Sequence, residues 1–376
     1  MEISEKIARI QGVFKHYDWG GKTFLPSLLN RSNEEGKPYA EYWLGSHLHE
    51  AAGKLPYLFK VQDVEKMLSI QVHPSKEVAK KKFEEENKKG VPLDAPNRNY
   101  KDDNHKPELL SPLGDFYLLH GFKPVEKLTA VLHKTPELQF LLKEFGEGNY
   151  KQLYTAVMTM PQEEVNKVLA PLTGRIVPLY NEGKLTKEDE DFWAARAALT
   201  FPSGNNIDRG IFSVYLFNIV KMKEGEALFQ DAGLPHAYLE GHTMEIMANS
   251  DNVLRGGLTP KHIDVPELLA NIKFAPTVPN VIKGSTASTH EEVFETPAED
   301  FQLSRIIVEP GEGISLHAVH ADIYFIYKGT GAAVADEERV DFRAGDALLA
   351  LPGSVVHLST ASRAVVYRAT VPAASK

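Results

Sequence analysis

The sequence predicts a mainly β protein with an α-helical insertion, built from two jelly-roll β-barrels and one helical domain. Three observations support this fold class. Residues 1–124 and 205–376 contain short β-branched and aromatic runs separated by Gly, Pro and Asp turns. Residues 125–204 instead show helical periodicity. The patterns GLPHAYLEG and LPGSVVHLS place a turn before a histidine in both strand-rich parts, which indicates two barrels of one type.

The composition is typical of a soluble globular protein and narrows the choice of partners. Of 376 residues, 43% are hydrophobic, and no apolar run approaches the roughly 18 residues that a membrane span requires. The formal net charge of −9 argues against nucleic acid as a partner, because a phosphate backbone favours a basic face. The absence of cysteine excludes disulfides and thiolate metal sites. The start, MEISEKIARIQGVF, lacks the pattern of a secretory signal, and we expect a cytoplasmic protein.

In the first strand-rich part, LPYLFKVQD (55–63) and DFYLLHGF (115–122) have the length and composition of strands. The charged stretch 80–108 lies between them, and its Gly, Pro, Asn and Asp content argues against helix beyond about residue 87. A loop of this length in a compact domain is usually functional, so we expect it to border a site or to act as a lid.

Residues 125–204 are expected to form several short helices. In PQEEVNKVLAPL, apolar residues recur at helical spacing from Val165 to Leu172, and Pro161 suits the first helical position. KEDEDFWAARAAL is rich in helix formers. The block offers no cluster of ligand-type residues, so we expect it to form one wall of a cleft without a chemical role.

The stretch SIQVHP places Gln71 and His73 two residues apart, so that both face the same side of a strand. Glu108, in NHKPE, and His236, in GLPHAYLEG, are further ligand-type residues that a barrel mouth can bring together with them. Two imidazoles, one carboxylate and one amide oxygen suit a divalent ion of borderline softness. Spacing alone leaves open the alternative that the four are unrelated surface and turn residues.

Several motifs occur in one order between about residue 10 and residue 275, and together they resemble the type I mannose-6-phosphate isomerases, also called phosphomannose isomerases, of the cupin superfamily. The motifs are HYDWGG (16–21), AEYWLGSH (40–47), LPYLFKV (55–61), SIQVHPSK (69–76), YKDDNHKPELL (100–110), GLPHAYLEG (233–241) and MANSDNVLRGGLTPKHIDV (247–265).

The resemblance implies a zinc-dependent isomerase that interconverts mannose 6-phosphate and fructose 6-phosphate through an enediol(ate). It implies one zinc per chain, held by Gln71, His73, Glu108 and His236. It also implies two cupin-type jelly-roll barrels. The catalytic barrel would comprise 1–124 and 205–294, the helical insertion 125–204, and the C-terminal cupin-like barrel 295–376.

The resemblance places Arg255 in the active site, where a guanidinium fits an enediolate or a phosphate. Lys106 would carry charge to substrate oxygen or act as a base, and His105 would relay a proton, oriented by Asp251. Which residue is the base stays open. Glu245 is a further catalytic candidate, and the substrate-binding candidates are Ser69, Tyr238 and Lys261.

In the C-terminal part, His317, His320 and His357 are similar to the histidines of metal-bearing cupins. The carboxylate expected after the second histidine is missing, since ADIYFIY offers only Asp322. We therefore expect a structural C-terminal barrel without a second metal.

Other interpretations fit parts of the pattern. His73, Glu108 and His236 are also a two-histidine, one-carboxylate set, as in iron oxygenases on related barrels, which metal analysis and oxygen uptake would reveal. A non-catalytic sugar-binding or regulatory protein would bind its ligand without turnover. For Arg255 itself, the alternative to an active-site role is a structural pair with Asp251. We expect a monomer.

Overall fold

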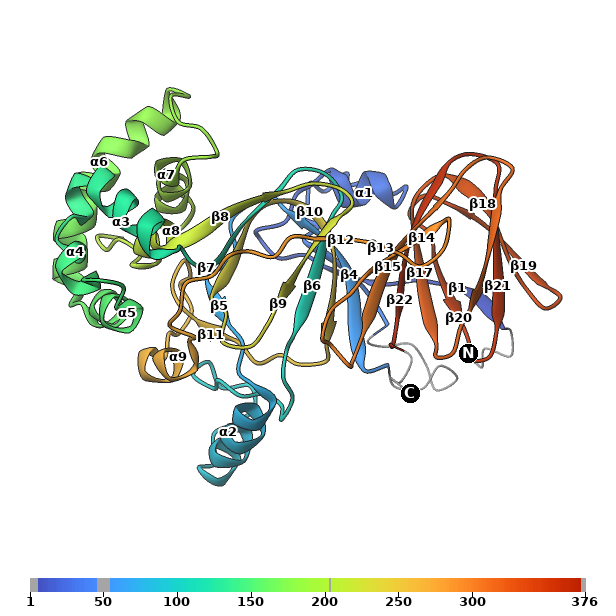
Figure 1. The fold of residues 1–376 in the computed structure, drawn as a ribbon, viewed down its shortest axis with the longest axis horizontal. Helices are drawn as coiled ribbons and strands as arrows, with labels where there is room; N and C mark the ends of the chain where they lie inside the picture. Colours follow the sequence, from blue (N-terminus) through green and yellow to red (C-terminus); the bar gives the residue numbers. More distant parts are fainter. Residues whose placement is uncertain (1–5, 46–54, 203, 373–376) are drawn as a thin grey trace.

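The computed structural model describes residues 6–45, 55–202 and 204–372. Its strands form three antiparallel sheets, and a block of helices lies at one end of the molecule (Figure 1). The sequence predicts a mainly β protein with a helical insertion, and the β-rich sheets with a helical segment confirm that part of the prediction. None of the helices in these three ranges is long and apolar enough to cross a membrane.

The largest sheet carries the candidate site. Its central path runs through β12 (Ile282–Lys283), β9 (Glu226–Gln230), β6 (Glu108–Pro112), β10 (His236–Ala248), β4 (Tyr57–Val64), β3 (Glu41–Leu44) and β2 (Val13–Lys15). Off this path lie β5 (Gln71–Val72), β7 (Phe116–Phe122), β8 (Phe217–Met222) and β11 (Leu254–Arg255). The long strand β10 pairs with β4, β5, β6 and β7, so segments far apart in the sequence meet along it.

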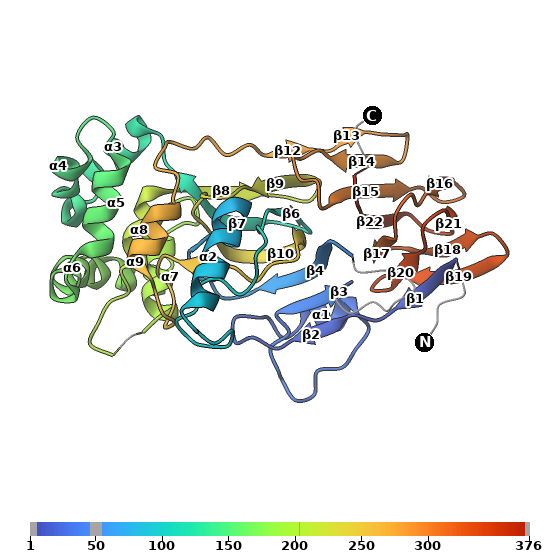
Figure 2. The same cartoon turned by 90° about the horizontal axis from the view of Figure 1, so that it is seen from below.

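The two other sheets lie at the opposite end from the helices (Figure 1). One is ordered β1 (Ile7–Ile10), β20 (Ala347–Ala350), β17 (Asp322–Lys328), β22 (Ala364–Thr370), β15 (Gln302–Val308), β14 (Glu291–Phe294) and β13 (Ser285–Thr286). The other is ordered β16 (Gly313–His317), β21 (Val355–Thr360), β18 (Thr330–Ala335) and β19 (Glu338–Arg343). Figure 2 shows the N-terminal strand β1 beside β20, so the start of the chain joins the C-terminal strands.

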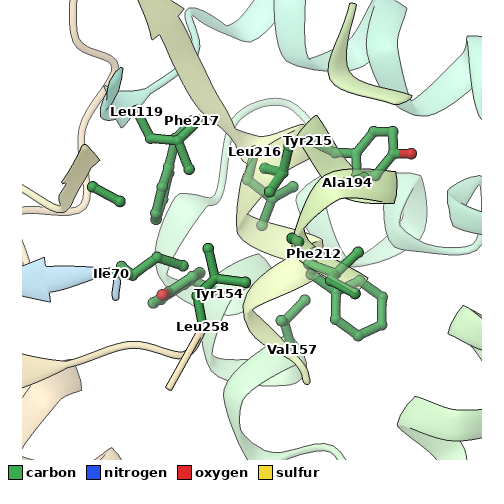
Figure 3. Packing of buried hydrophobic residues seen from close by; sticks show 14 of the residues in the cluster. Ile70, Leu119, Tyr154, Val157, Ala194, Phe212, Tyr215, Leu216, Phe217 and Leu258 are labelled. Carbon is green, nitrogen blue, oxygen red and sulfur yellow. The ribbon is translucent and has the colours of Figure 1, made fainter. Parts of the chain in front are cut away.

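The helices cluster beside β7 and β8. They are α3 (Val125–Lys134), α4 (Leu141–Phe145), α5 (Tyr150–Thr159), α6 (Gln162–Asn181), α7 (Glu190–Thr200) and α8 (Gly210–Leu216), with a 3₁₀ turn at Pro136–Leu138. The remaining helices are α1 (Phe24–Leu28), α2 (Lys76–Lys88) and α9 (Val265–Asn271). A buried core joins the helices to the large sheet, and Figure 3 shows Ile70, Tyr154, Leu216 and Leu258 within it.

Helix α6 is longer than the short helix expected there. It spans 20 residues and continues through Pro171 and Pro178 to Asn181. A proline inside a helix removes one backbone hydrogen bond, but the buried stripe continues from Leu172 to Ile176 on the same face. Burial of that face compensates for the lost bond, and tertiary packing decides the length of the helix.

The charged stretch after β5 begins as helix α2, which ends at Lys88 close to the predicted position. The irregular segment that follows is held by side-chain hydrogen bonds. The Arg98 guanidinium donates to the backbone oxygens of Val91 and Tyr100, and the Tyr100 hydroxyl donates to Glu267 of α9 at 2.6 Å. The segment before Glu108 is therefore bound to α9 by a side-chain hydrogen bond.

Candidate active site

Two histidines and one glutamate, from the ends of three strands, converge inside the large sheet. His73 follows β5, Glu108 begins β6 and His236 begins β10. Ligand-type atoms of the three residues all lie within 4.8 Å of one another, and all three side chains are buried. The Nε2 atoms of His73 and His236 each lie 3.4 Å from a different Glu108 oxygen.

The hydrogen bonds of the two imidazoles fix which nitrogen carries the proton. His73 Nδ1 lies 3.2 Å from the backbone oxygen of Asn252, and His236 Nδ1 lies 2.9 Å from that of Leu234. Because a carbonyl oxygen only accepts, each Nδ1–H donates to it, and each Nε2 keeps its lone pair toward Glu108. This is the arrangement in which a backbone carbonyl orients a metal-binding histidine.

The donor set fits a divalent metal such as zinc. The Nε2 of His73 is buried and has no hydrogen-bond partner among the described residues, a costly state that a metal bond would relieve. Burial lowers the pKa of His73 to about 4, so the ring is neutral at neutral pH, as a ligand must be. Two imidazoles and a carboxylate match the protein ligands of catalytic zinc sites.

Glu108 is ionised despite its burial. Burial alone would raise the pKa of Glu108, but the positive charge of Lys106 opposes burial, and the pKa of Glu108 lies well below its usual range. The Lys106 ammonium lies 3.4 Å from Glu108 Oε1. Lys106 and Glu108, both predicted to be site residues, are therefore in contact.

A cavity of about 240 Å³ opens beside the three residues. It is lined by Glu108 and His236 together with most of the residues that the sequence singled out. These are Ser69, Gln71, Lys106, Tyr238, Glu245, Asp251 and Arg255. Gln71 is the register partner of both His236 and Arg255, which places it between the metal candidates and the arginine.

An outer cavity of about 720 Å³ shares Ser69, Gln71 and Arg255 with the inner one. It adds Lys261, together with Thr200 and Phe201 from the end of α7 and the residue after it. Burial lowers the pKa of Arg255, and burial with the nearby Arg255 lowers that of Lys261. Two cations thus face the opening, and the helical block contributes one wall, as expected.

Lys60 is a charged residue on the wall of the inner cavity. It lies in no distinctive motif, so sequence analysis did not identify it as a site residue. Its ammonium lies 2.7 Å from Glu245 Oε2 and 3.2 Å from Glu41 Oε1. Burial would lower the pKa of Lys60, but Glu245 and Glu41 outweigh burial and raise it, so the group is cationic. The alternation of side chains along β4 could have identified Lys60 as a site residue, because Lys60 and Gln62 point to the same face of the strand.

Glu245 lies in the same hydrogen-bonded group. The Tyr238 hydroxyl donates to its Oε1 at 2.5 Å, while Lys60 pairs with the other oxygen. Glu245 is Lys60's register partner across β10 and β4, which explains why the two side chains meet. Burial raises the pKa of Glu245 above its usual value.

His105 and Asp251 differ from the expected arrangement. His105 Nε2 lies 2.7 Å from Asp300 Oδ2, so its partner is Asp300 and not Asp251. Asp300 precedes β15 in the C-terminal part of the chain and was beyond the reach of a local motif. Asp251 lies on the cavity wall, with its backbone N–H donating to Asp102. Arg255 forms no ion pair with Asp251 within the described ranges.

The C-terminal histidines do not form a similar group. His317 and His357 are exposed, and His357 Nδ1 lies 2.7 Å from the Ser315 hydroxyl. Asp322 is buried and paired with Arg368 at 2.6 Å. In the part of the chain that the structure describes, the metal-type group at Glu108 has no C-terminal counterpart.

Known proteins share both the sequence and the fold. Residues 48–125 match the family described as "Phosphomannose isomerase type I, catalytic domain". Mannose-6-phosphate isomerase of Salmonella typhimurium is 34% identical over 372 residues, covering 88% of this chain and 91% of that protein. The Bos taurus enzyme is 31% identical, covering 88% and 89%.

Solved structures agree with these relatives. The Salmonella typhimurium mannose 6-phosphate isomerase bound to fructose 6-phosphate and zinc has a TM-score of 0.86 at 31% identity. The alignment covers 98% of this chain and all of that one. A zinc-bound mannose 6-phosphate isomerase matches with the same TM-score and coverage. With this sequence identity over nearly its whole length, the chain belongs to the type I phosphomannose isomerase family.

Proposed function

We propose that this protein interconverts mannose 6-phosphate and fructose 6-phosphate by moving a proton between C1 and C2 through an enediol(ate), with one zinc per chain. The observation that carries this proposal is the buried group His73, Glu108 and His236, of which Glu108 and His236 line a cavity that also contains the cations Lys60, Lys106 and Arg255. Family membership supports it, since the zinc-bound relative holds fructose 6-phosphate.

The residues proposed to hold zinc are Gln71, His73, Glu108 and His236. A bound zinc would supply Lewis-acid polarisation of substrate oxygens without any change of oxidation state. The neutral Gln71 amide leaves the set with a single carboxylate. The protein's own contribution is orientation, because backbone carbonyls of Asn252 and Leu234 fix both imidazoles before substrate arrives.

Arg255 and Lys106 are proposed to stabilise the negative charge that develops on substrate oxygen. Both line the inner cavity, and Lys106 lies next to Glu108. A cation fixed before the reaction stabilises an enediolate without reorganisation. Lys60 adds a third positive group to the wall, although it is also held by two carboxylates.

Glu245 is the proposed proton-transfer group. Burial raises the pKa of Glu245, a direction that favours a carboxyl group as a proton-transfer group. Tyr238 and Lys60 orient its two oxygens. His105 and Asp251 are retained as further catalytic candidates; Asp251 lines the inner cavity, and His105 contacts Asp300.

Ser69, Tyr238 and Lys261 are the proposed substrate-binding residues. Ser69 and Lys261 lie at the outer cavity, where a phosphate group would reach solvent while the sugar carbons approach Glu245. Tyr238 lies in the inner wall and lines the path of the sugar.

We also infer the domain division, the oligomeric state and the location in the cell. Residues 1–124 with 205–294 are proposed as a catalytic cupin-type jelly roll, 125–204 as its helical insertion and 295–376 as a C-terminal cupin-like barrel. The antiparallel sheets support this division, although β1, β13 and β14 belong to the sheet of the C-terminal strands and α8 extends the helices beyond 204. A cytoplasmic monomer stays a prediction, and light scattering tests the oligomeric state.

A coupled assay tests the function directly. Fructose 6-phosphate formation from mannose 6-phosphate is measured for the purified protein, then after treatment with a chelator, and then after zinc is restored. The proposal expects turnover, its loss and its return. Turnover that persists after complete metal removal would contradict the zinc-dependent mechanism, and oxygen uptake with bound iron would favour an oxygenase.

A further inference from the structure

The turn that carries Arg255 and Lys261 has an unusual backbone. Leu258 adopts φ = +54°, a left-handed conformation that is uncommon for a residue with a branched side chain. Its side chain is fully buried, and Figure 3 shows it in the core with Tyr154 and Ile70. Such a conformation persists only where the surrounding structure holds it, and it occurs preferentially at functional sites.

The Asp208 carboxylate holds this turn. Its Oδ1 accepts the backbone N–H of Leu258 at 2.8 Å, and its Oδ2 accepts that of Thr259 at 3.0 Å. Oδ1 also accepts the N–H of Gly210 at 2.7 Å, which fixes the start of α8. Hydrogen bonds to an ionised acceptor are stronger than neutral ones, so one side chain ties the turn to the helical block.

The two backbones are in very close contact at this point. A Cβ on Gly257 would lie 2.5 Å from the Cα of Gly210, and a Cβ on Gly210 would lie 2.5 Å from the backbone nitrogen of Leu258. A Cβ on Gly256 would lie 2.9 Å from the Ile70 side chain. The glycines beside Arg255 therefore allow protein segments to approach one another, and Asp208 sits at the centre of that contact.

The turn is joined in the other direction to the strand of the metal candidates. Gly256 N–H donates to Ile70 O at 2.9 Å, and Ile70 N–H donates to Gly257 O at 3.0 Å. Arg255 is the register partner of Gln71. Asp208 thus acts on a turn whose one end presents Arg255 to the inner cavity and whose other end presents Lys261 to the outer one.

We infer that Asp208 is a positioning residue of the isomerase: it holds the strained turn at Leu258 so that Arg255 and Lys261 point into the substrate cavity. The inference rests on the proposed function. Asp208 does not line either cavity, so it acts on substrate only through the turn. Displacement of a catalytic group by about 1 Å can cost on the order of 10²-fold in rate.

The test compares Asp208→Ala with Asp264→Ala. Asp264 is a matched control because its carboxylate also accepts a backbone N–H, that of Glu267, but caps α9 and not the turn. Asp208→Ala should lower kcat/KM for mannose 6-phosphate by about 10- to 100-fold with unchanged zinc content. Asp208→Asn keeps the Oδ1 acceptor for Leu258 and should show a smaller loss, and it replaces the alanine variant if that one fails to fold. Asp264→Ala should stay within about threefold of the unsubstituted chain.

A double-mutant cycle separates positioning from general stability. In the Arg255→Ala/Lys261→Ala background, Asp208→Ala should lower kcat/KM by less than about twofold, because the groups that it positions are gone. A further loss as large as in the unsubstituted background overturns the inference, as does an Asp208→Ala or Asp208→Asn protein with full activity. If the unsubstituted chain itself has no isomerase activity, the proposed function fails, and the inference fails with it.

Discussion

The large sheet and the C-terminal sheets both place a histidine after a turn, but they use their polar residues differently. In the large sheet, two buried imidazoles turn their Nε2 atoms toward Glu108. In the C-terminal sheets, His317 and His357 are exposed, and the buried Asp322 is paired with Arg368. The comparison teaches that a metal site needs buried ligand atoms that converge, and not only ligand-type residues in a familiar order.

The largest expected effect comes from the carboxylate of the first region. Glu108→Ala removes the group between the two imidazoles, and turnover should fall to the assay background. The loss should exceed the roughly 10- to 100-fold that follows from losing an outer partner of a ligand. Metal content, measured by elemental analysis, should fall with it. An active Glu108→Ala protein would contradict the distinction between the two regions, because turnover would then not depend on the group His73, Glu108 and His236 of the large sheet.

The next effect concerns Arg255. Arg255→Ala should lower kcat by about 10²–10³-fold, the size expected for a fixed donor that stabilises developing charge. Zinc content and the melting temperature should be unchanged. If the arginine served ground-state phosphate instead, the loss would appear in KM with kcat nearly intact. Steady-state kinetics of Arg255→Ala and Arg255→Lys distinguish the two roles.

The C-terminal ion pair should affect stability and not catalysis. Arg368→Ala leaves Asp322 and Glu291 without their shared cation, and breaking a buried pair costs about 3–5 kcal/mol of unfolding free energy. Denaturant unfolding measures this loss, and turnover per folded chain should be unchanged. Arg363→Ala is the matched control, because its exposed pair with Glu309 should contribute less than about 1 kcal/mol. Equal effects of the two variants would contradict the structural role of Arg368.

The smallest expected effect is that of His357→Ala. Its side chain is exposed and contacts Ser315, so stability should change by less than about 0.5 kcal/mol. Turnover and metal content should match those of the unsubstituted chain. A variant that loses metal would place a second site in the C-terminal sheets.

Much of the fold was predictable because the signals are local. The strand 55–63 is observed as β4 and 115–122 as β7, each within two residues of the predicted ends. The helical stripe from Val165 is buried as expected. The length of α6 and the pairing of β1 with β20 depend instead on contacts between distant segments, which no single window of sequence contains.

The site was predictable only in part, for a similar reason. His73, Glu108 and His236 have family motifs, so the resemblance identified them where spacing did not. Lys60 was missed because a lysine in an apolar strand reads as a surface residue, and only the buried Glu41 and Glu245 opposite make its burial tolerable. The partner of His105 was mistaken because Asp300 lies almost two hundred positions further along the chain.

The most direct test of the account is the metal content of the purified protein and of His236→Ala. We predict about one zinc per unsubstituted chain and the loss of most of it in His236→Ala, since His236 Nε2 faces Glu108. Two equivalents in the unsubstituted chain, with one surviving in His236→Ala, would contradict the claim that the large sheet alone holds the metal.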